Sequence, residues 1–148
     1  MTEFRFRLAK VLDLRQTELA LAETRFRRQA AAVAALDRQR ADLEASAIRA
    51  ELAVRESTQI EGADLAALAD FRHCISAKRG ALVAARAQAQ REYDTLQAAM
   101  LEARRRVRLL ERLRDRRLAE WKQALDRELD QLASDSHLAK LAHDSFRT

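Results

Sequence analysis

The chain has 148 residues, of which 34% are charged, and it contains no proline, no asparagine and two glycines. Proline and glycine interrupt helices at about 3 and about 1 kcal/mol relative to alanine, so this composition favours long helices and argues against a rounded domain with a large apolar core. The only cysteine, Cys74, excludes an intrachain disulfide, and charges recur too often for an apolar membrane span of ~20 residues. The opening MTEFRFRLAK is charged where a signal peptide would be apolar, so we expect a cytosolic protein.

The first predicted helix covers about residues 3–58. Apolar side chains follow two rows at heptad spacing, which is the pattern of a helix that packs along one seam. The first row holds Leu12, Leu19, Phe26, Val33, Ala47 and Val54, and the second holds Leu8, Ala22, Leu36, Leu43 and Ala50. Arg15, Gln29 and Arg40 interrupt the rows, which favours a pairing of modest stability.

A turn is predicted at about residues 59–64. Gly62 can take the left-handed conformation that closes a helix, and Asp64 can cap the next helix. A short connection places neighbouring helices antiparallel, so alanine-rich residues 30–35 and 81–89 should face each other.

The second predicted helix covers about residues 65–133 and is longer than the first. Its seam runs through Leu68, Ile75, Leu82, Ala89, Leu96, Met100, Ala103, Val107 and Leu110, then shifts to Leu118, Trp121, Leu125, Leu129 and Leu132. Beyond roughly residue 120 its apolar face should lack an intrachain partner, and residues 134–148 should form a weakly ordered tail. The expected fold is all-α: one domain over residues 1–148, a long two-helix antiparallel coiled-coil hairpin whose second helix is longer.

Basic residues concentrate in one segment of the second helix. Residues 101–122 hold nine basic and four acidic side chains, which leaves 19 of each sign elsewhere and places the net charge of +5 here. Arg104, Arg108 and Arg112 form a stripe, flanked by Arg105, Arg116 and Arg117, and the hairpin would bring Arg5, Arg7 and Lys10 beside it. Such a stripe is either a solvated face or a docking surface for an acidic protein; the absence of nearby aromatic platforms disfavours nucleic acid.

The opening Phe4-Arg5-Phe6-Arg7-Leu8, followed by Val11, Leu12 and Arg15, resembles the start of the FliJ family of flagellar type III export proteins. The resemblance extends over nearly the whole chain, through its length, the mid-chain turn and the arginine-rich second helix. Injectisome stalk proteins of the YscO type share this architecture. The family implies a non-enzymatic coupler at the cytoplasmic face of the inner membrane, with three kinds of partner: the hexameric export ATPase, the export gate protein FlhA and export chaperones.

The resemblance also implies two binding sites. The terminal end of the hairpin would enter the ATPase ring through Phe4, Phe6, Arg104, Arg105, Arg108 and Arg112, although the two phenylalanines could instead cap a coiled-coil core. A patch near the turn would contact FlhA. Its positions here are Gln39, Leu43, Ser46 and Ala50 on the first helix and Phe71, Ile75, Lys78 and Leu82 on the second.

Half of the gate patch keeps the family's character. Gln39, Leu43, Phe71 and Ile75 match in type. Tyrosines are usual where Ser46 and Ala50 stand, and Lys78 and Leu82 replace a small residue and a histidine. Seam packing is an alternative role for Phe71, Ile75 and Leu82.

No catalytic or cofactor site is predicted. His73, Cys74, His137 and His143 include no pair at the i, i+4 spacing of helical metal ligands, and no phosphate-binding loop is present. We therefore expect a protein that is not an enzyme and needs no cofactor. The alternative to an export coupler is a coiled-coil scaffold or dimerisation protein whose basic stripe is either solvated or binds nucleic acid.

Overall fold

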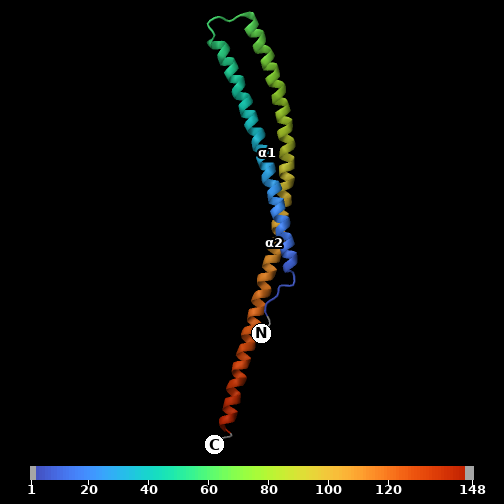
Figure 1. Ribbon diagram of the computed structural model, residues 1–148, viewed down its shortest axis with the longest axis vertical. Coiled ribbons are helices and arrows are strands. Elements are labelled where there is room, and N and C mark those ends of the chain that lie inside the picture. The colour runs from blue at the N-terminus through green and yellow to red at the C-terminus, as the bar shows by residue number, and fades with distance from the viewer. Residues whose placement is uncertain (1–2, 146–148) are drawn as a thin grey trace. The chain divides into compact units, whose positions relative to one another are not determined.

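The computed structural model describes residues 3–145, and in this range the chain forms two helices and no strand (Figure 1). Helix α1 is Ala9–Glu56 and helix α2 is Gly62–Ser145. The prediction of an all-α, two-helix hairpin with a longer second helix is confirmed. Residue contacts group into two compact units, Leu19–Ala103 and the combination of Met1–Glu18 with Arg104–Thr148. The single domain expected over residues 1–148 stays a prediction, and each unit is described by itself below.

In the unit Leu19–Ala103, α1 and α2 lie side by side and antiparallel, joined by residues 57–61 (Figure 1). The rings of Phe26 and Tyr93 pack with their centroids 4.9 Å apart. Ile75, Ala89 and Met100 are buried on α2, and the seam positions of α1 are half-buried. The heptad rows therefore identified the packed face of both helices.

Gln29, which interrupts the apolar seam, has a structural role in this unit. Its side-chain Nε2 donates a hydrogen bond of 2.9 Å to the backbone carbonyl of Ala89 on the opposite helix. The alanine side chain is small enough for the glutamine amide to reach that carbonyl. Since Asp37 lies beside Arg86, the alanine stretch 30–35 faces only the last part of residues 81–89.

The turn differs from its prediction. Gly62 does not adopt a positive φ; it is the first residue of α2, and the reversal takes place earlier, over residues 57–61. Because several residues share the change in direction, none needs the left-handed conformation. Asp64 was expected to precede and cap the second helix, but it lies in the first turn of α2. There its Oδ2 accepts a hydrogen bond of 3.0 Å from the Glu61 N–H, the acidic half of a capping box.

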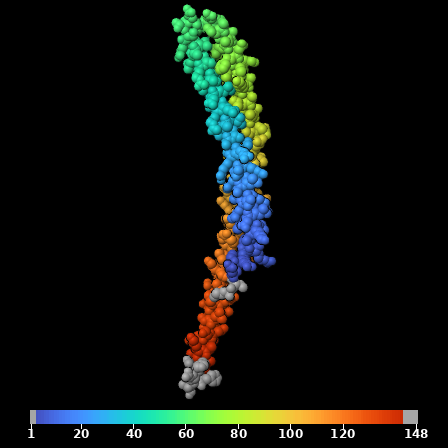
Figure 2. Space-filling view, viewed as in Figure 1, coloured from blue at the N-terminus to red at the C-terminus, as the bar shows by residue number. Residues whose placement is uncertain are grey.

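The unit that combines Met1–Glu18 with Arg104–Thr148 contains the start of α1 and the last part of α2. The first helix was expected from residue 3, but it begins at Ala9, where the Ala9 N–H donates to the Phe6 carbonyl at 3.1 Å. Residues 3–8 instead run along α2 (Figure 2). Leu12 and Val107, each 5% exposed, form the core of this unit.

Helix α2 continues past its expected end at residue 133 and reaches Ser145. Ser134 does not break it, because its Oγ donates to the Asp130 carbonyl one turn earlier, at 2.9 Å, and no proline or glycine follows. Residues 134–145 of the expected tail are therefore helical, and residues 146–148 lie outside the described range. Every side chain in residues 126–142 is exposed, including Leu132 and Leu138.

Candidate functional site

Residues 3–8 and the facing part of α2 line a hollow. We call residues 3–8 the N-terminal arm. The cavity has a volume of about 700 Å³ and lies between the arm and Leu113, Arg117 and Trp121. Because the arm is not part of α1, its backbone can follow the surface of α2. Its side chains can then line the hollow together with those of α2.

Phe4 fixes the arm to α2. Its ring packs on that of Trp121, with centroids 6.0 Å apart and an angle of 53° between the planes, a tilted arrangement typical of aromatic pairs. Phe4, Phe6 and Trp121 are all half-buried. Trp121 was expected to lack an intrachain partner, and that prediction is wrong, because the arm reaches further along α2 than a helix starting at residue 3 would. The two phenylalanines cap this end of the packing and also line the cavity.

The tryptophan gives a direct readout of this contact, since it is the only one in the chain. Replacing Phe4 by alanine should shift Trp121 emission to longer wavelength and increase its quenching by acrylamide, because the indole loses its cover. Phe71→Ala, a change of the same size in the other unit, should leave the emission unaltered. Identical spectra for Phe4→Ala and the wild type would contradict the Phe4–Trp121 contact.

The arginine stripe is rotated relative to its prediction. Arg104 is half-buried and has an interaction partner, whereas Arg105, Arg108 and Arg112 are exposed and form no ion pair with any residue in the range 3–145. Val107 lies buried on the opposite side of the helix. Of the arginines predicted for ATPase binding, Arg105, Arg108 and Arg112 therefore face outward, and Arg116 is exposed one turn further along α2. We call Arg105, Arg108 and Arg112 the arginine stripe from here on.

Other arginines of this segment are partly neutralised. Arg117 is 2.9 Å from Glu120 and Arg114 is 3.1 Å from Asp115. These pairs are exposed and contribute little to stability. The arginine stripe and Arg116, like Arg5 and Arg7 of the arm, form no ion pair within the described residues and keep their positive charge uncompensated there.

The predicted gate patch is divided by the structure. Gln39, Leu43, Ser46, Lys78 and Leu82 line one shallow hollow of about 530 Å³, whereas Ala50 and Phe71 line another beside the turn. Ile75 is 5% exposed and belongs to the core of its unit, as the seam-packing alternative expected. Of the matching positions, Gln39, Leu43 and Phe71 thus remain accessible to a partner.

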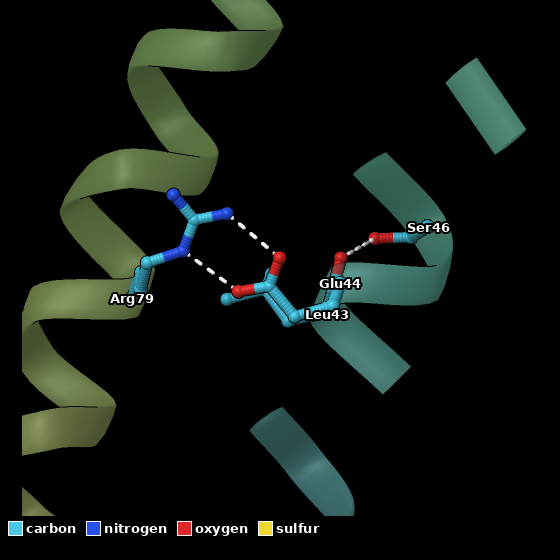
Figure 3. A network of polar contacts seen from close by, with 4 residues as sticks. All are labelled: Leu43, Glu44, Ser46 and Arg79. Atoms are coloured by element: carbon cyan, nitrogen blue, oxygen red, sulfur yellow. Dashed lines mark hydrogen bonds and ion pairs between the residues drawn. The ribbon is translucent and has the colours of Figure 1, made fainter. Parts of the chain in front are cut away.

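A fork-shaped ion pair joins α1 and α2 (Figure 3). Arg79 donates from Nε to Glu44 Oε1 at 2.7 Å and from Nη2 to Oε2 at 2.8 Å, while the Ser46 Oγ donates to the Leu43 carbonyl at 2.7 Å. The hydrogen bonds from Arg79 lower the pKa of the Glu44 carboxyl, against a smaller opposing effect of desolvation; the same contact raises the pKa of Arg79. Each partner is the chain neighbour of a residue that lines the first hollow: Glu44 follows Leu43, and Arg79 follows Lys78.

This pair belongs to a ladder that the sequence analysis missed. Glu51–Arg72 and Asp37–Arg86, both at 3.1 Å, join the same helices one heptad to either side of Glu44–Arg79. The signal was present in the sequence: acidic residues recur every seven positions in the first helix and arginines every seven in the second. Apolar periodicity alone does not report pairs that flank a seam.

The Glu44 carboxylate makes the stability of this unit dependent on pH. Its pKa in the folded chain is below the ordinary value, so the stabilisation is present above the ordinary pKa and is lost as the pH falls through the folded pKa. We expect Glu44→Gln to lower the Tm modestly at neutral pH and to reduce the loss of Tm on acidification. Thermal melts at pH 7 and pH 3 measure both effects, with Glu56→Gln as a control for an exposed glutamate of the same helix. A Glu44→Gln variant with the wild-type acid profile would contradict this role.

Within residues 3–145, no group of three or more histidine, cysteine, aspartate or glutamate side chains is placed to hold a metal ion. None of the helices in that range has a stretch both long and apolar enough to cross a membrane.

Comparison with known protein families decides the relationship of the chain. The family model described as flagellar FliJ protein matches residues 4–145, which is nearly the whole sequence. This chain belongs to the FliJ family. Comparisons with curated proteins and with solved structures gave no significant match. The resemblance of the opening motif to the FliJ family is thus confirmed, and the chain is a component of flagellar type III protein export.

In this FliJ-family chain, the opening motif divides between two structural roles. Phe4 and Phe6 lie in the N-terminal arm, while Leu12 is buried in the first turns of α1. The residues that the resemblance implied for ATPase binding all lie in the unit that contains both the arm and the arginine stripe. Those implied for the gate lie in the other unit.

Proposed function

We propose that this protein is a non-enzymatic coupler that docks on the flagellar export ATPase ring through the arginine stripe and the N-terminal arm. The observation that carries the proposal is the set of exposed arginines that form no ion pair among residues 3–145, in the unit that also contains an arm held by an aromatic contact. A guanidinium with no partner in its own chain keeps its donors for a carboxylate of another protein. The family assignment supports the export apparatus as the setting of that partner.

The same proposal assigns the other unit to the export gate and chaperones. Gln39 and Leu43 line a hollow that both helices form, and Phe71 lies beside the turn. Binding of the FlhA cytoplasmic domain at these residues would link the gate to the ATPase through one protein. The coupler would then work at the cytoplasmic face of the inner membrane, without inserting into the bilayer and without a catalytic site or cofactor of its own.

Charge reversal in the arginine stripe tests the ATPase contact. We expect Arg105→Glu with Arg112→Glu to weaken binding to the purified ATPase by at least tenfold, because two attractive contacts become repulsive. The matched control is Arg38→Glu with Arg49→Glu, the same change in charge at exposed residues of the other unit. Binding is measured by biolayer interferometry at low and high salt, since screening should weaken an interaction of this kind.

Equal affinities for the stripe variant and the control variant would remove the arginine stripe from the interface. Absence of any binding by the wild type, together with tight binding of a DNA duplex at physiological salt, would favour the nucleic-acid-binding scaffold instead.

A further inference from the structure

The cavity between the N-terminal arm and α2 has both aromatic and arginine side chains in its lining. We propose that it binds an acidic peptide segment that carries one bulky apolar residue, and that this segment belongs to the export ATPase. The inference rests on the proposed function and specifies the chemistry of the partner's surface. It concerns the arm and Trp121, which are distinct from the arginine stripe.

The interior of the cavity is apolar. Trp121 and Leu113 contribute from α2, and Phe4, Phe6 and Leu8 from the arm. A volume of about 700 Å³ lies within the range of cavities that bind small ligands and exceeds the volume of one leucine or phenylalanine side chain. Trp121, Phe4 and Phe6 are only half-buried, so a bound apolar group would remove further aromatic surface from water.

The rim of the cavity is basic. Arg5, Arg7 and Arg117 line it, against one carboxylate, that of Glu3. Arg117 already contacts Glu120 at 2.9 Å, but Arg5 and Arg7 form no ion pair among residues 3–145. An apolar interior with the unpaired guanidinium groups of Arg5 and Arg7 at its rim complements an apolar side chain flanked by carboxylates, which can accept bidentate hydrogen bonds from arginine.

The aromatic geometry favours a peptide over a nucleic acid. Bases bind proteins by stacking on exposed aromatic faces, and here the Phe4 and Trp121 rings cover part of each other at 6.0 Å. A single aliphatic or aromatic side chain can enter beside such a pair without displacing it. The anionic groups recognised at the rim are therefore carboxylates of the same segment.

The test uses the full chain and its one tryptophan as the probe. A synthetic peptide with a leucine between two pairs of glutamates, free of tryptophan, is titrated while Trp121 emission is recorded. We expect a saturable change in emission, absent with a peptide in which glutamine replaces every glutamate. Arg5→Gln with Arg7→Gln should weaken binding on the order of tenfold, whereas Arg38→Gln with Arg49→Gln should not. The arm lies outside the helices, so these substitutions leave the fold intact, which circular dichroism verifies.

Competition identifies the occupant. The glutamate peptide should reduce binding of the wild-type chain to the ATPase, and a dT oligonucleotide should not change Trp121 emission. Equal binding of the glutamate and glutamine peptides, a response to the oligonucleotide alone, or peptide binding without competition would each overturn the inference. A different result would contradict the proposed function: failure of the wild-type chain to bind the ATPase, whether or not the peptide binds.

Discussion

Replacing Ile75 by alanine should lower the free energy of unfolding by about 2–5 kcal/mol, the usual cost of removing a buried large aliphatic side chain. Ile75 is 5% exposed, and it lies in a two-helix layer with few other buried side chains. Neighbouring residues of so thin a core have little freedom to fill the space, so part of the loss is the cavity itself. Urea denaturation followed by circular dichroism measures the change.

Ile48→Ala is the matched control for this substitution. Ile48 is 59% exposed, so the same chemical change should alter the free energy of unfolding by less than about 0.5 kcal/mol. Equal effects at the two positions would contradict the packing of α1 on α2 described here. The result also bears on the gate patch, because a loss of FlhA binding by Ile75→Ala would report unfolding and not a lost contact.

A proline in the middle of α2 should be similarly damaging. Ala84→Pro should cost about 3 kcal/mol or more, because the ring clashes with the preceding turn and the hydrogen bond from residue 84 to the Gly80 carbonyl is lost. Ala84 is exposed, so the loss would come from the backbone alone. Thermal unfolding of this variant and of Ala84→Ser separates the effect of the proline ring from that of replacing the alanine by another small side chain.

The turn provides the control position for proline. Thr58 lies between the helices, and its N–H donates to no backbone carbonyl among residues 3–145. Thr58→Pro should therefore change the Tm far less than Ala84→Pro. If both prolines were equally harmful, the reversal would not be confined to residues 57–61.

The sequence predicted the helices and their seam well because both depend on local and periodic signals. Leu12, Ile75 and Val107 were assigned to the seam from heptad spacing, and all are buried. The turn was predicted within a few residues of its position in the structure, but the left-handed conformation predicted for Gly62 was wrong. A glycine allows a positive φ but does not require it, and Gly62 does not adopt one.

The end of α2 and the course of the arm were harder to predict. Serines and an aspartate at residues 134–136 suggest a helix terminus, yet Ser134 bonds back within the helix. The arm leaves the helical path because Phe4 gains contact with Trp121, more than 100 positions away in the sequence. No local pattern reports a contact at that separation.

Only part of the candidate site could be predicted from the sequence, for a related reason. The density of arginine in residues 101–122 showed where the basic segment lies. It did not show which arginines face outward. Arg104 turned inward because the packed face of α2 drifts relative to a strict heptad, which leaves Arg105, Arg108 and Arg112 exposed. The side of α2 that faces outward is set by packing against α1. The spacing of residues along the sequence fixes that side only approximately.

ATP turnover by the purified export ATPase, measured with increasing amounts of this protein, tests whether the chain docks on the ring. A coupler that docks on the ring should raise turnover and the hexamer population together, with saturation. The Arg105→Glu, Arg112→Glu variant should leave both near their values without added protein, while the Arg38→Glu, Arg49→Glu control should match the wild type. Unchanged turnover and ring assembly with the wild-type chain, under conditions where the ATPase is active, would contradict the account.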